Sequence, residues 1–261
     1  MTEEQVAIEA ALAAGRVLAE ARDVRAAGGG LGVRHKGAVD LVTEYDLRCE
    51  AAIREVLARH TPDVPVYGEE GGGAADARTR WVVDPIDGTT NFVHGFPYFA
   101  VSIGLEVDGA PTVGVVLDGV RGTVFRATTG KGAWADDQRI RVSGARTLDE
   151  ALCATGFAYD RRTRAAFYLR FVAAALEHTQ GIRRAGAAAL DLSMVAAGAI
   201  DLYWEFNLSW WDVAAGTVLV QEAGGRVDPI PGRTRNDPVA TNGWLHDLWM
   251  EQMERLLEEG T

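Results

Sequence analysis

The chain has 261 residues, of which 48% are hydrophobic, so it is long enough and apolar enough to fold around a substantial core. This composition excludes disorder as the main state. Its 37 acidic and 26 basic residues give a formal net charge of −11, whose field repels polyanions and disfavours a nucleic-acid or anionic-membrane partner.

Two helices are predicted in the N-terminal region. The first starts behind Thr2, which forms a capping-box pattern with Gln5, and ends at the glycines of 28–30. The polar residues 31–40 favour a loop or a weak hairpin. The second helix is expected over 43–60 with its first residue as the cap. Its inward side chains are expected to be Leu47, Ile53, Val56 and Leu57.

The middle of the chain has β patterns, and the rest alternates strands with helices. Turn residues such as Asp108 and Gly109 join neighbouring β segments, which indicates antiparallel pairing. The predicted strands are 64–67, 81–83, 100–107, 112–117, 123–127, 152–155 and 202–205, and the later helices are 163–178, 187–199 and 211–223. We therefore expect an α/β (α+β) fold with halves 1–143 and 144–261, which form one compact unit because no flexible linker separates them.

The segment 81–92, WVVDPIDGTTNF, carries two aspartates three positions apart at the end of an apolar strand. Pro85 biases Asp84 toward an extended conformation, so Asp84 and Asp87 can point at one spot. Such close carboxylates raise each other's pKa unless a cation lies between them. Together with the Ile86 carbonyl they are the hard oxygen ligands that suit Mg²⁺. An ordinary surface turn is the alternative interpretation, but it gives no stabilising reason for the cluster.

Further residues are expected to join this site. Gly88, Thr89 and Thr90 offer successive backbone NH groups to a phosphate if they open a helix. Glu69 follows a predicted strand, and Asp212 lies in the first turn of a predicted helix. Each acidic residue alone is typical of a solvated position or a favourable helix-dipole interaction, so its significance comes from the combination.

With these acidic segments taken together, the chain resembles the inositol monophosphatase family. The similarity includes WVVDPIDGTTNFVHGFPYFAVSIGL, GEE, SWWDVAAGTVLVQEAGG, KGAVDLVTEYD and RRAGAAALDL, and it is loosest over 160–179. The resemblance implies the layered αβαβα sugar-phosphatase fold of the inositol monophosphatase and fructose-1,6-bisphosphatase type. It also implies a homodimer, two or three Mg²⁺ ions per active site, and inhibition by lithium.

The same resemblance implies a set of metal ligands. Glu69, Asp84 and the Ile86 carbonyl would hold the first Mg²⁺, and Glu69 with water would hold a third. The second ion would lie between Asp84, Asp87 and Asp212. Bound ions of this kind neutralise a phosphate dianion, acidify water and stabilise the leaving alkoxide, and no phosphoenzyme is expected.

Catalytic residues also follow from the resemblance. Thr89, hydrogen-bonded to Asp46, would help Glu69 to orient and deprotonate the attacking water. The NH groups of Gly88 and Thr89 would hold the phosphate. Lys36 matches a loop lysine near the third metal, and a solvated loop lysine is an equally good interpretation.

Substrate contacts are implied at Asp87, Gly186, Ala188 and Glu205, which match positions that touch polyol hydroxyls. Ala187 departs from the animal members of the family, which have a threonine there, so one hydroxyl contact is absent. The pattern favours inositol 1-phosphate as substrate. Fructose 1,6-bisphosphate, histidinol phosphate, NADP(H) and 3′-phosphoadenosine phosphates are the alternatives, because active-site motifs separate these substrates poorly.

Other functions fit less well. The aspartate spacing differs from the DxD of haloacid dehalogenase phosphatases, and no G-x-x-x-x-G-K-[ST] nucleotide motif occurs. A catalytically silent scaffold protein would have lost a metal ligand, whereas all the acidic ones are present. We expect a protein with no membrane segment, because no signal-peptide pattern or long apolar stretch occurs. A reducing, cytoplasmic setting is expected, because the two cysteines, Cys49 and Cys153, are neither closely spaced nor paired with histidines in a metal-ligand pattern.

Overall fold

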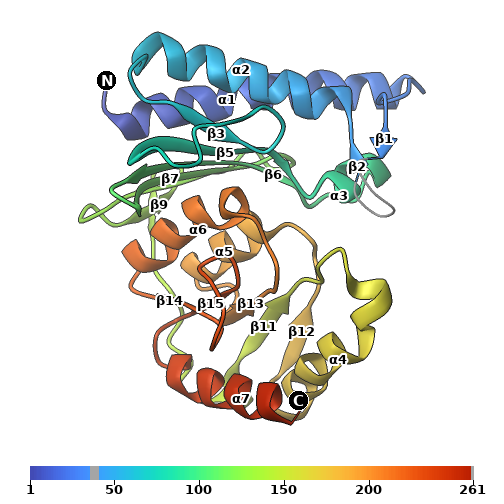
Figure 1. Ribbon diagram of the computed structural model, residues 1–261, viewed down its shortest axis with the longest axis vertical. Helices are drawn as coiled ribbons and strands as arrows, with labels where there is room; N and C mark the ends of the chain where they lie inside the picture. The colour runs from blue at the N-terminus through green and yellow to red at the C-terminus, as the bar shows by residue number, and fades with distance from the viewer. Residues whose placement is uncertain (36–40, 260–261) are drawn as a thin grey trace.

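A computed structural model describes residues 1–35 and 41–259 of the chain, and its elements form alternating layers of helices and sheets (Figure 1). The helices are α1 (Glu3–Ala26), α2 (Glu44–His60), α3 (Thr89–His94), α4 (Arg161–His178), α5 (Ala188–Ala196), α6 (Trp210–Glu222) and α7 (His246–Glu258), with a 3₁₀ turn at Leu148–Glu150. The strands are β1 (Arg34–His35), β2 (Leu41–Val42), β3 (Val66–Gly68), β4 (Gly72–Gly73), β5 (Thr79–Asp87), β6 (Ala100–Val107), β7 (Ala110–Asp118), β8 (Val124–Thr128), β9 (Ala133–Ala135), β10 (Gln138–Ile140), β11 (Leu152–Thr155), β12 (Gly181–Arg183), β13 (Leu202–Trp204), β14 (Arg226–Pro229) and β15 (Pro238–Thr241).

The helices α1 and α2 pack together on one face of the larger sheet. Both begin where predicted, because Thr2 and Thr43 form capping boxes. Their apolar sides share one hydrophobic cluster with β5, β6 and β7. The prediction for Leu47 is wrong, since 52% of this residue is exposed. It precedes the buried Ile53 by six residues, and at about 100° per residue this spacing turns it away from the buried side.

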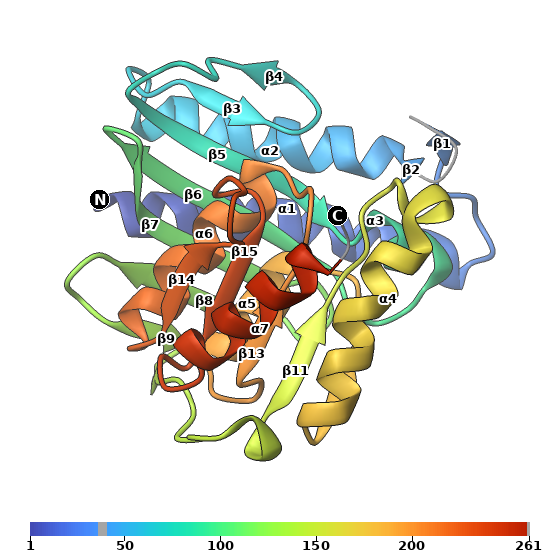
Figure 2. The same ribbon diagram turned by 60° about the horizontal axis from the view of Figure 1, so that its bottom comes forward.

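The larger sheet has eight strands in the order β10-β9-β8-β7-β6-β5-β3-β4. Neighbours pair antiparallel, which confirms the pairing predicted from the turn residues, except for β3 and β5, which pair parallel. Figure 2 shows these strands side by side, with α1 and α2 behind them and α5 and α6 in front. Strands β4, β9 and β10 were not predicted, because two or three residues are too few for a periodic pattern.

A separate pair of short strands lies between α1 and α2. Strands β1 and β2 run antiparallel, which agrees with a weak hairpin in this region. The connecting residues 36–40, which include Lys36, lie outside the described residues. The expectation for Lys36 therefore stays a prediction.

The smaller sheet has five strands in the order β12-β11-β13-β15-β14. Strand β11 pairs parallel with β12 and β13, and the remaining pairs are antiparallel. Strands β12, β14 and β15 and the helix α7 were not predicted. The aromatic C-terminal segment contributes one side chain to the core, because Trp249 is fully buried against Trp204. Trp244, in contrast, is exposed.

The layer order is helix, sheet, helix, sheet, helix, which confirms the expected αβαβα fold (Figure 1). Helices α5 and α6 form the middle layer, and a second hydrophobic cluster joins them to both sheets. A third cluster lies under α4 and α7 on the outer face of the smaller sheet. Because α6 comes late in the chain but packs on β5, β6 and β7, the two sheets share one interior. The division of the chain at residue 143 stays a prediction.

Within the described ranges, no helix combines the length and the apolar character needed to cross a membrane.

Candidate active site

The site begins at the end of β5, where the strand carries an irregularity. Asp84 lies opposite Ser102 on β6, and Asp87 lies opposite Ala100, so three residue steps on β5 match two on β6. In a regular strand, side chains three positions apart point to opposite faces. The extra residue of a bulge removes this alternation, and both carboxylates can therefore face the same side.

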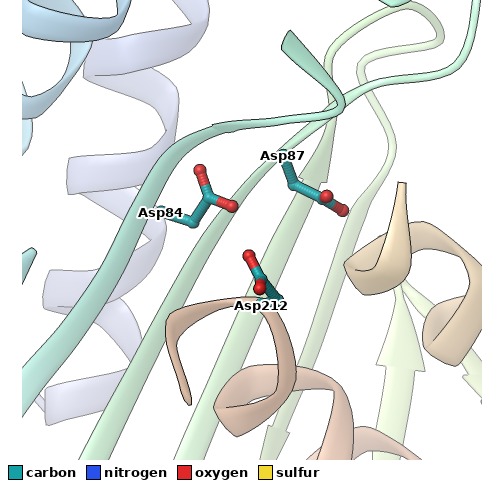
Figure 3. A group of neighbouring side chains, drawn as sticks. All are labelled: Asp84, Asp87 and Asp212. Carbon is teal, nitrogen blue, oxygen red and sulfur yellow. The ribbon is translucent and has the colours of Figure 1, made fainter. Parts of the chain in front are cut away.

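A third carboxylate reaches the same point from the middle helix layer. Asp212 lies in the first turn of α6, as predicted, and its Oδ2 accepts a 2.7 Å hydrogen bond from the NH of Ser209. Figure 3 shows Asp84 and Asp87 at the end of β5 and Asp212 at the start of α6, with the three side chains around one space. One ligand oxygen from each lies within 4.8 Å of the other two. Three such oxygens could hold a metal ion.

Asp87 also joins the larger sheet to the start of α5. Its Oδ2 accepts a 2.7 Å hydrogen bond from the NH of Ala189, in the first turn of that helix. The helix needs an acceptor there, because its N-cap residue is Ala187, which has no side-chain oxygen. The carboxylate of a distant strand thus takes the place of a local cap.

Burial and mutual repulsion disfavour the charged forms of these carboxyl groups. Burial is the largest cause of the raised pKa of Asp84, followed by the charges of Glu69 and Asp212. Burial also raises the pKa of Asp87 to about 7, and it raises that of Asp212. A cation between the three groups would reverse this preference. The donor set therefore fits a divalent metal ion.

Glu69 is placed next to this group by the strand before it. Its NH donates a 3.1 Å hydrogen bond to the Val83 carbonyl, and its side chain lines the same cleft. It is outside the set of three whose oxygens lie within 4.8 Å of one another. Its charge nevertheless contributes to the raised pKa of all three aspartates.

Gly88 and Thr89 form the turn from β5 into α3, so the predicted helix start is present. Gly88 has φ 85°, and a Cβ there would lie 3.1 Å from the Gly186 carbonyl oxygen. Both the left-handed backbone conformation and the lack of space for a Cβ therefore require glycine at this position. The Thr89 hydroxyl lies 3.2 Å from Asp46 Oδ1 and 2.9 Å from the Ile86 carbonyl oxygen. The expected Thr89–Asp46 contact is thus found, with a second acceptor beside it.

Asp46 is held for this contact by the start of α2. Its Oδ2 accepts hydrogen bonds from the NH and the hydroxyl of Thr43, at 2.7 and 2.6 Å. Burial is the largest cause of its raised pKa, and the hydrogen bonds from Thr43 act against that rise. Asp46 therefore has one oxygen in the helix cap and the other directed to Thr89.

The opposite wall of the cleft comes from the C-terminal half of the chain. Gly186, Ala188 and Glu205 all line it, as the resemblance implies. Glu205 is buried and accepts a 2.7 Å hydrogen bond from the Tyr203 hydroxyl. Burial is the largest cause of its raised pKa. Gly156 lies directly beneath it, since a Cβ there would be 2.0 Å from Glu205 Oε2.

Asn91 ties the two walls together. Its Nδ2 donates to the carbonyl oxygens of Tyr98 and Ala185, at 2.7 and 2.8 Å, and lies 3.3 Å from that of Gly186. The first contact is within the turn region after β5, and the other two are with the loop before α5. The asparagine of DPIDGTTNF therefore has a positioning role that the sequence pattern alone did not assign.

The complete cleft has a volume of about 490 Å³. The sequence prediction did not include several residues that line it, among them Phe157, Arg161, Arg184 and Asn207. The RRAGAAALDL segment is the one sequence feature that could have drawn attention to Arg184. Nothing comparable marks Arg161, because it lies where the family resemblance is loosest.

The fold and the cleft define a class of layered α/β protein with a buried acidic site. A profile described as the inositol monophosphatase family matches residues 2–259. Nus factor SuhB of Pseudomonas aeruginosa is 45% identical over 236 residues, which are 87% of this chain and 85% of that protein. The inositol-1-monophosphatase of Synechocystis is 46% identical over 227 residues, 82% of this chain and 77% of that protein.

Solved structures agree with this assignment. The inositol monophosphatase of Anabaena superposes with a TM-score of 0.81 at 38% identity, covering 98% of this chain and 95% of that one. The chain belongs to the inositol monophosphatase family.

Proposed function

We propose that the protein is a Mg²⁺-dependent phosphomonoesterase that hydrolyses a small sugar or polyol phosphate, with inositol 1-phosphate as the favoured substrate. The observation that carries the proposal is the group formed by the buried Asp84 and Asp87 and the half-buried Asp212 in the wall of a cleft. Membership of the family and the name of the Synechocystis relative support the substrate class.

The proposed metal ligands are those that the family resemblance implies. Glu69, Asp84 and the Ile86 carbonyl would hold one Mg²⁺, and Asp84, Asp87 and Asp212 a second, with Glu69 and water as ligands of a third. When bound, Mg²⁺ supplies charge neutralisation of the ester, acidification of water and stabilisation of the leaving oxygen.

The residues of the chain orient the reactants. Thr89, held by Asp46, orients the attacking water with Glu69, and Glu69 accepts its proton. The backbone NH groups of Gly88 and Thr89 hold the phosphate. Because the Thr89 hydroxyl has a single proton, donation to Asp46 leaves its lone pairs free for the water.

The proposed polyol contacts lie across the cleft. Asp87 and Glu205 accept hydrogen bonds from hydroxyl groups, and the backbone at Gly186 and Ala188 provides further polar atoms. Both carboxylates are held in place, Asp87 by the NH of Ala189 and Glu205 by the Tyr203 hydroxyl. Ala187 has no hydroxyl, so a contact that a threonine would make is missing.

The experiment that tests the proposal is a steady-state survey of phosphate release with Mg²⁺. We expect the highest kcat/KM for inositol 1-phosphate among the sugar phosphates, bisphosphates and nucleotide phosphates considered, since specificity is a ratio of these values. Absence of Mg²⁺-dependent phosphate release from every substrate would refute the assignment.

A non-catalytic role is the second candidate, because several relatives, among them that of Pseudomonas aeruginosa, are named Nus factors. The intact set of acidic residues in the cleft favours catalysis, and the phosphate-release assay decides between the two. We also propose a cytoplasmic homodimer. The reducing compartment is supported by Cys49 and Cys153, which are both buried and free.

Lithium provides a further test of the metal site. We expect lithium to inhibit at high substrate, because a monovalent ion neutralises product phosphate less well than Mg²⁺. Titration of turnover with LiCl measures the effect, and insensitivity into the range of hundreds of millimolar would contradict an animal-like site.

A further inference from the structure

The cleft contains two arginines in addition to its acidic residues. Arg161 and Arg184 both line it, together with the carboxylates already described. A phosphate monoester needs one set of cations at the acidic end, which bound Mg²⁺ would supply. Two permanent positive charges elsewhere in the same cleft are not required for a substrate whose remaining groups are neutral hydroxyls.

Arg184 is held at the cleft wall by the residues around it. Its Nη1 lies over Gly186, where a Cβ would come within 2.3 Å of it, so the glycine leaves the space that the guanidinium fills. The guanidinium carbon lies 5.5 Å from the centre of the Phe157 ring, a favourable cation–π position. These contacts direct the guanidinium without neutralising it.

Its charge is not paired within the part of the chain that the structure describes. No carboxylate there lies within 4.0 Å of the Arg184 nitrogens. Its field does reach the site, because it acts against the rise that burial causes in the pKa of Glu205. Arg184 therefore lies near the polyol wall with its hydrogen-bond donors available.

Arg161 adds a second charge nearby. It is the first residue of α4 and follows the N-cap residue Asp160, whose carboxylate pairs with Arg164 at 3.2 Å. The Arg161 guanidinium itself lies 6.0 Å from the centre of the Tyr159 ring. Arg161 also shares the cleft wall with Phe157, which Arg184 contacts.

We propose that Arg184 and Arg161 form a subsite for a second phosphate group on the substrate, so that a sugar bisphosphate is hydrolysed more efficiently than the sugar phosphate that lacks its second phosphate. The inference rests on the proposed function, since it assumes that the first phosphate binds at the acidic end. A guanidinium binds phosphate through two parallel hydrogen bonds, which gives direction as well as charge.

The electrostatics of the cleft explain why such a subsite needs arginines. The protein has a net charge of −11, and five acidic side chains line the cleft: Glu69, Asp84, Asp87, Glu205 and Asp212. A second phosphate outside the reach of the metal ions would be repelled by this field. Two arginines on the wall would offset the repulsion at one place, and they would thereby select where the second phosphate lies.

The experiment compares fructose 1,6-bisphosphate with fructose 1-phosphate, which differ by the second phosphate alone. We expect the wild-type protein to have the higher kcat/KM for the bisphosphate. Arg184→Ala should lower that value by roughly tenfold to a hundredfold, because a hydrogen bond to a charged group is lost, and should lower the bisphosphate to monophosphate ratio with it. Arg184→Lys should be intermediate, since it keeps the charge but not the paired donors, and Arg161→Ala should act in the same direction.

Arg183 provides the matched control. It is the adjacent arginine, it is exposed, and it does not line the cleft. Arg183→Ala should leave the ratio of the two kcat/KM values unchanged. An equal change in Arg183→Ala and Arg184→Ala would mean that net charge acts at long range, and the subsite would be refuted.

Two other outcomes overturn the subsite. One is a wild-type preference for the monophosphate. The other is an equal loss on both substrates in Arg184→Ala, which would assign Arg184 to the scissile phosphate instead. Each leaves Mg²⁺-dependent hydrolysis of fructose 1-phosphate intact, so the subsite can fail while the proposed function stands. Failure of the proposed function would appear as no phosphate release from either substrate.

Discussion

The acidic group and the arginines of the cleft are built differently. Asp84 and Asp87 are buried at the end of a strand, Asp212 is half-buried at the start of a helix, and hydrogen bonds from the backbone hold each of them. Elsewhere on the cleft wall, Arg161 and Arg184 are partly or largely exposed and lie against aromatic faces. Rigid placement suits chemistry that tolerates little displacement, whereas exposed side chains can change with less cost to the fold.

The largest effect should follow from changing the acidic end. Asp87→Asn or Asp212→Asn should reduce kcat by orders of magnitude, because a charged metal ligand is lost while the amide keeps an oxygen for the backbone NH. The metal-free protein should be as stable or more stable, since like charges no longer repel. Turnover with Mg²⁺ and the melting temperature in EDTA measure both. Near-normal kcat at moderate Mg²⁺ in either variant would show that the metal site is assigned wrongly.

The next effect concerns the water-orienting pair beside that end. Thr89→Ala should lower kcat about 10²-fold with little change in KM, and Thr89→Ser should recover much of the rate. Asp46→Asn should behave like Thr89→Ala, and the double variant should be scarcely worse than either, because the two residues act as one unit. If the losses multiply, or if KM rises at constant kcat, the pair has a structural role only.

A smaller and more selective effect is expected at the polyol wall. Gly156→Ala would place a Cβ 2.0 Å from Glu205 Oε2 and must displace that carboxylate. We expect KM for inositol 1-phosphate to rise about tenfold, as loss of one hydrogen bond to a charged group implies. Hydrolysis of p-nitrophenyl phosphate, which has no polyol hydroxyls, should change little.

Gly144 is the matched control for that variant. A Cβ there has no atom within 4 Å, and its φ is not in the left-handed region. Gly144→Ala should therefore leave both substrates unaffected. Equal losses on both substrates in Gly156→Ala would indicate general damage to the cleft rather than a polyol contact.

The smallest effect should appear in the pH dependence of metal-free stability. The pKa of Asp87 rises from 3.8 to about 7 on folding, so the folded state binds the proton more tightly than the unfolded state. Its contribution is fully present below pH 3.8 and is lost as the pH rises through about 7. The stability gap between Asp87→Asn and wild type should widen over this range, because the buried Asp87 carboxyl of the wild type must ionise in the folded state as the pH rises.

Thermal unfolding in EDTA between pH 4 and pH 7 measures this gap, and Mg²⁺ at pH 7 should close it by binding the folded wild-type protein. A gap that stays constant across the pH range would mean that Asp87 ionises freely in the folded state.

The sequence predicted most of the regular elements, because β6 and α6 have clear periodic patterns and α1 and α2 have clear caps. It also predicted that Asp84 and Asp87 lie together, although the bulge that makes this possible needs the partner strand β6 to be seen. The short strands β9 and β12 carry no pattern of their own and form only because neighbours supply hydrogen bonds. The prediction for Leu47 is wrong because it followed the hydrophobicity of the side chain and not its position in the helical repeat.

The arginines of the cleft show a second limit of sequence reasoning. Arg184 reaches the site because Gly186 leaves space for it, and Arg161 because α4 starts at the cleft. Neither relation is visible in a linear pattern without the tertiary fold. The proposed roles of Asp84 and Asp87 can be predicted from the sequence because one long motif, DPIDGTTNF, contains both.

Three of the acidic residues near the cleft also accept backbone hydrogen bonds at the starts of helices. Asp46 accepts from Thr43 at the start of α2, Asp87 from Ala189 at the start of α5, and Asp212 from Ser209 at the start of α6. If the first turn of one of these helices unfolds locally, the carboxylate loses its hydrogen bond and is misaligned. This would happen even in a molecule that as a whole still unfolds cooperatively. Distance from the ligand is therefore a poor guide to which substitutions this scaffold tolerates. A residue at a helix start that never contacts the substrate can still position a carboxylate that does.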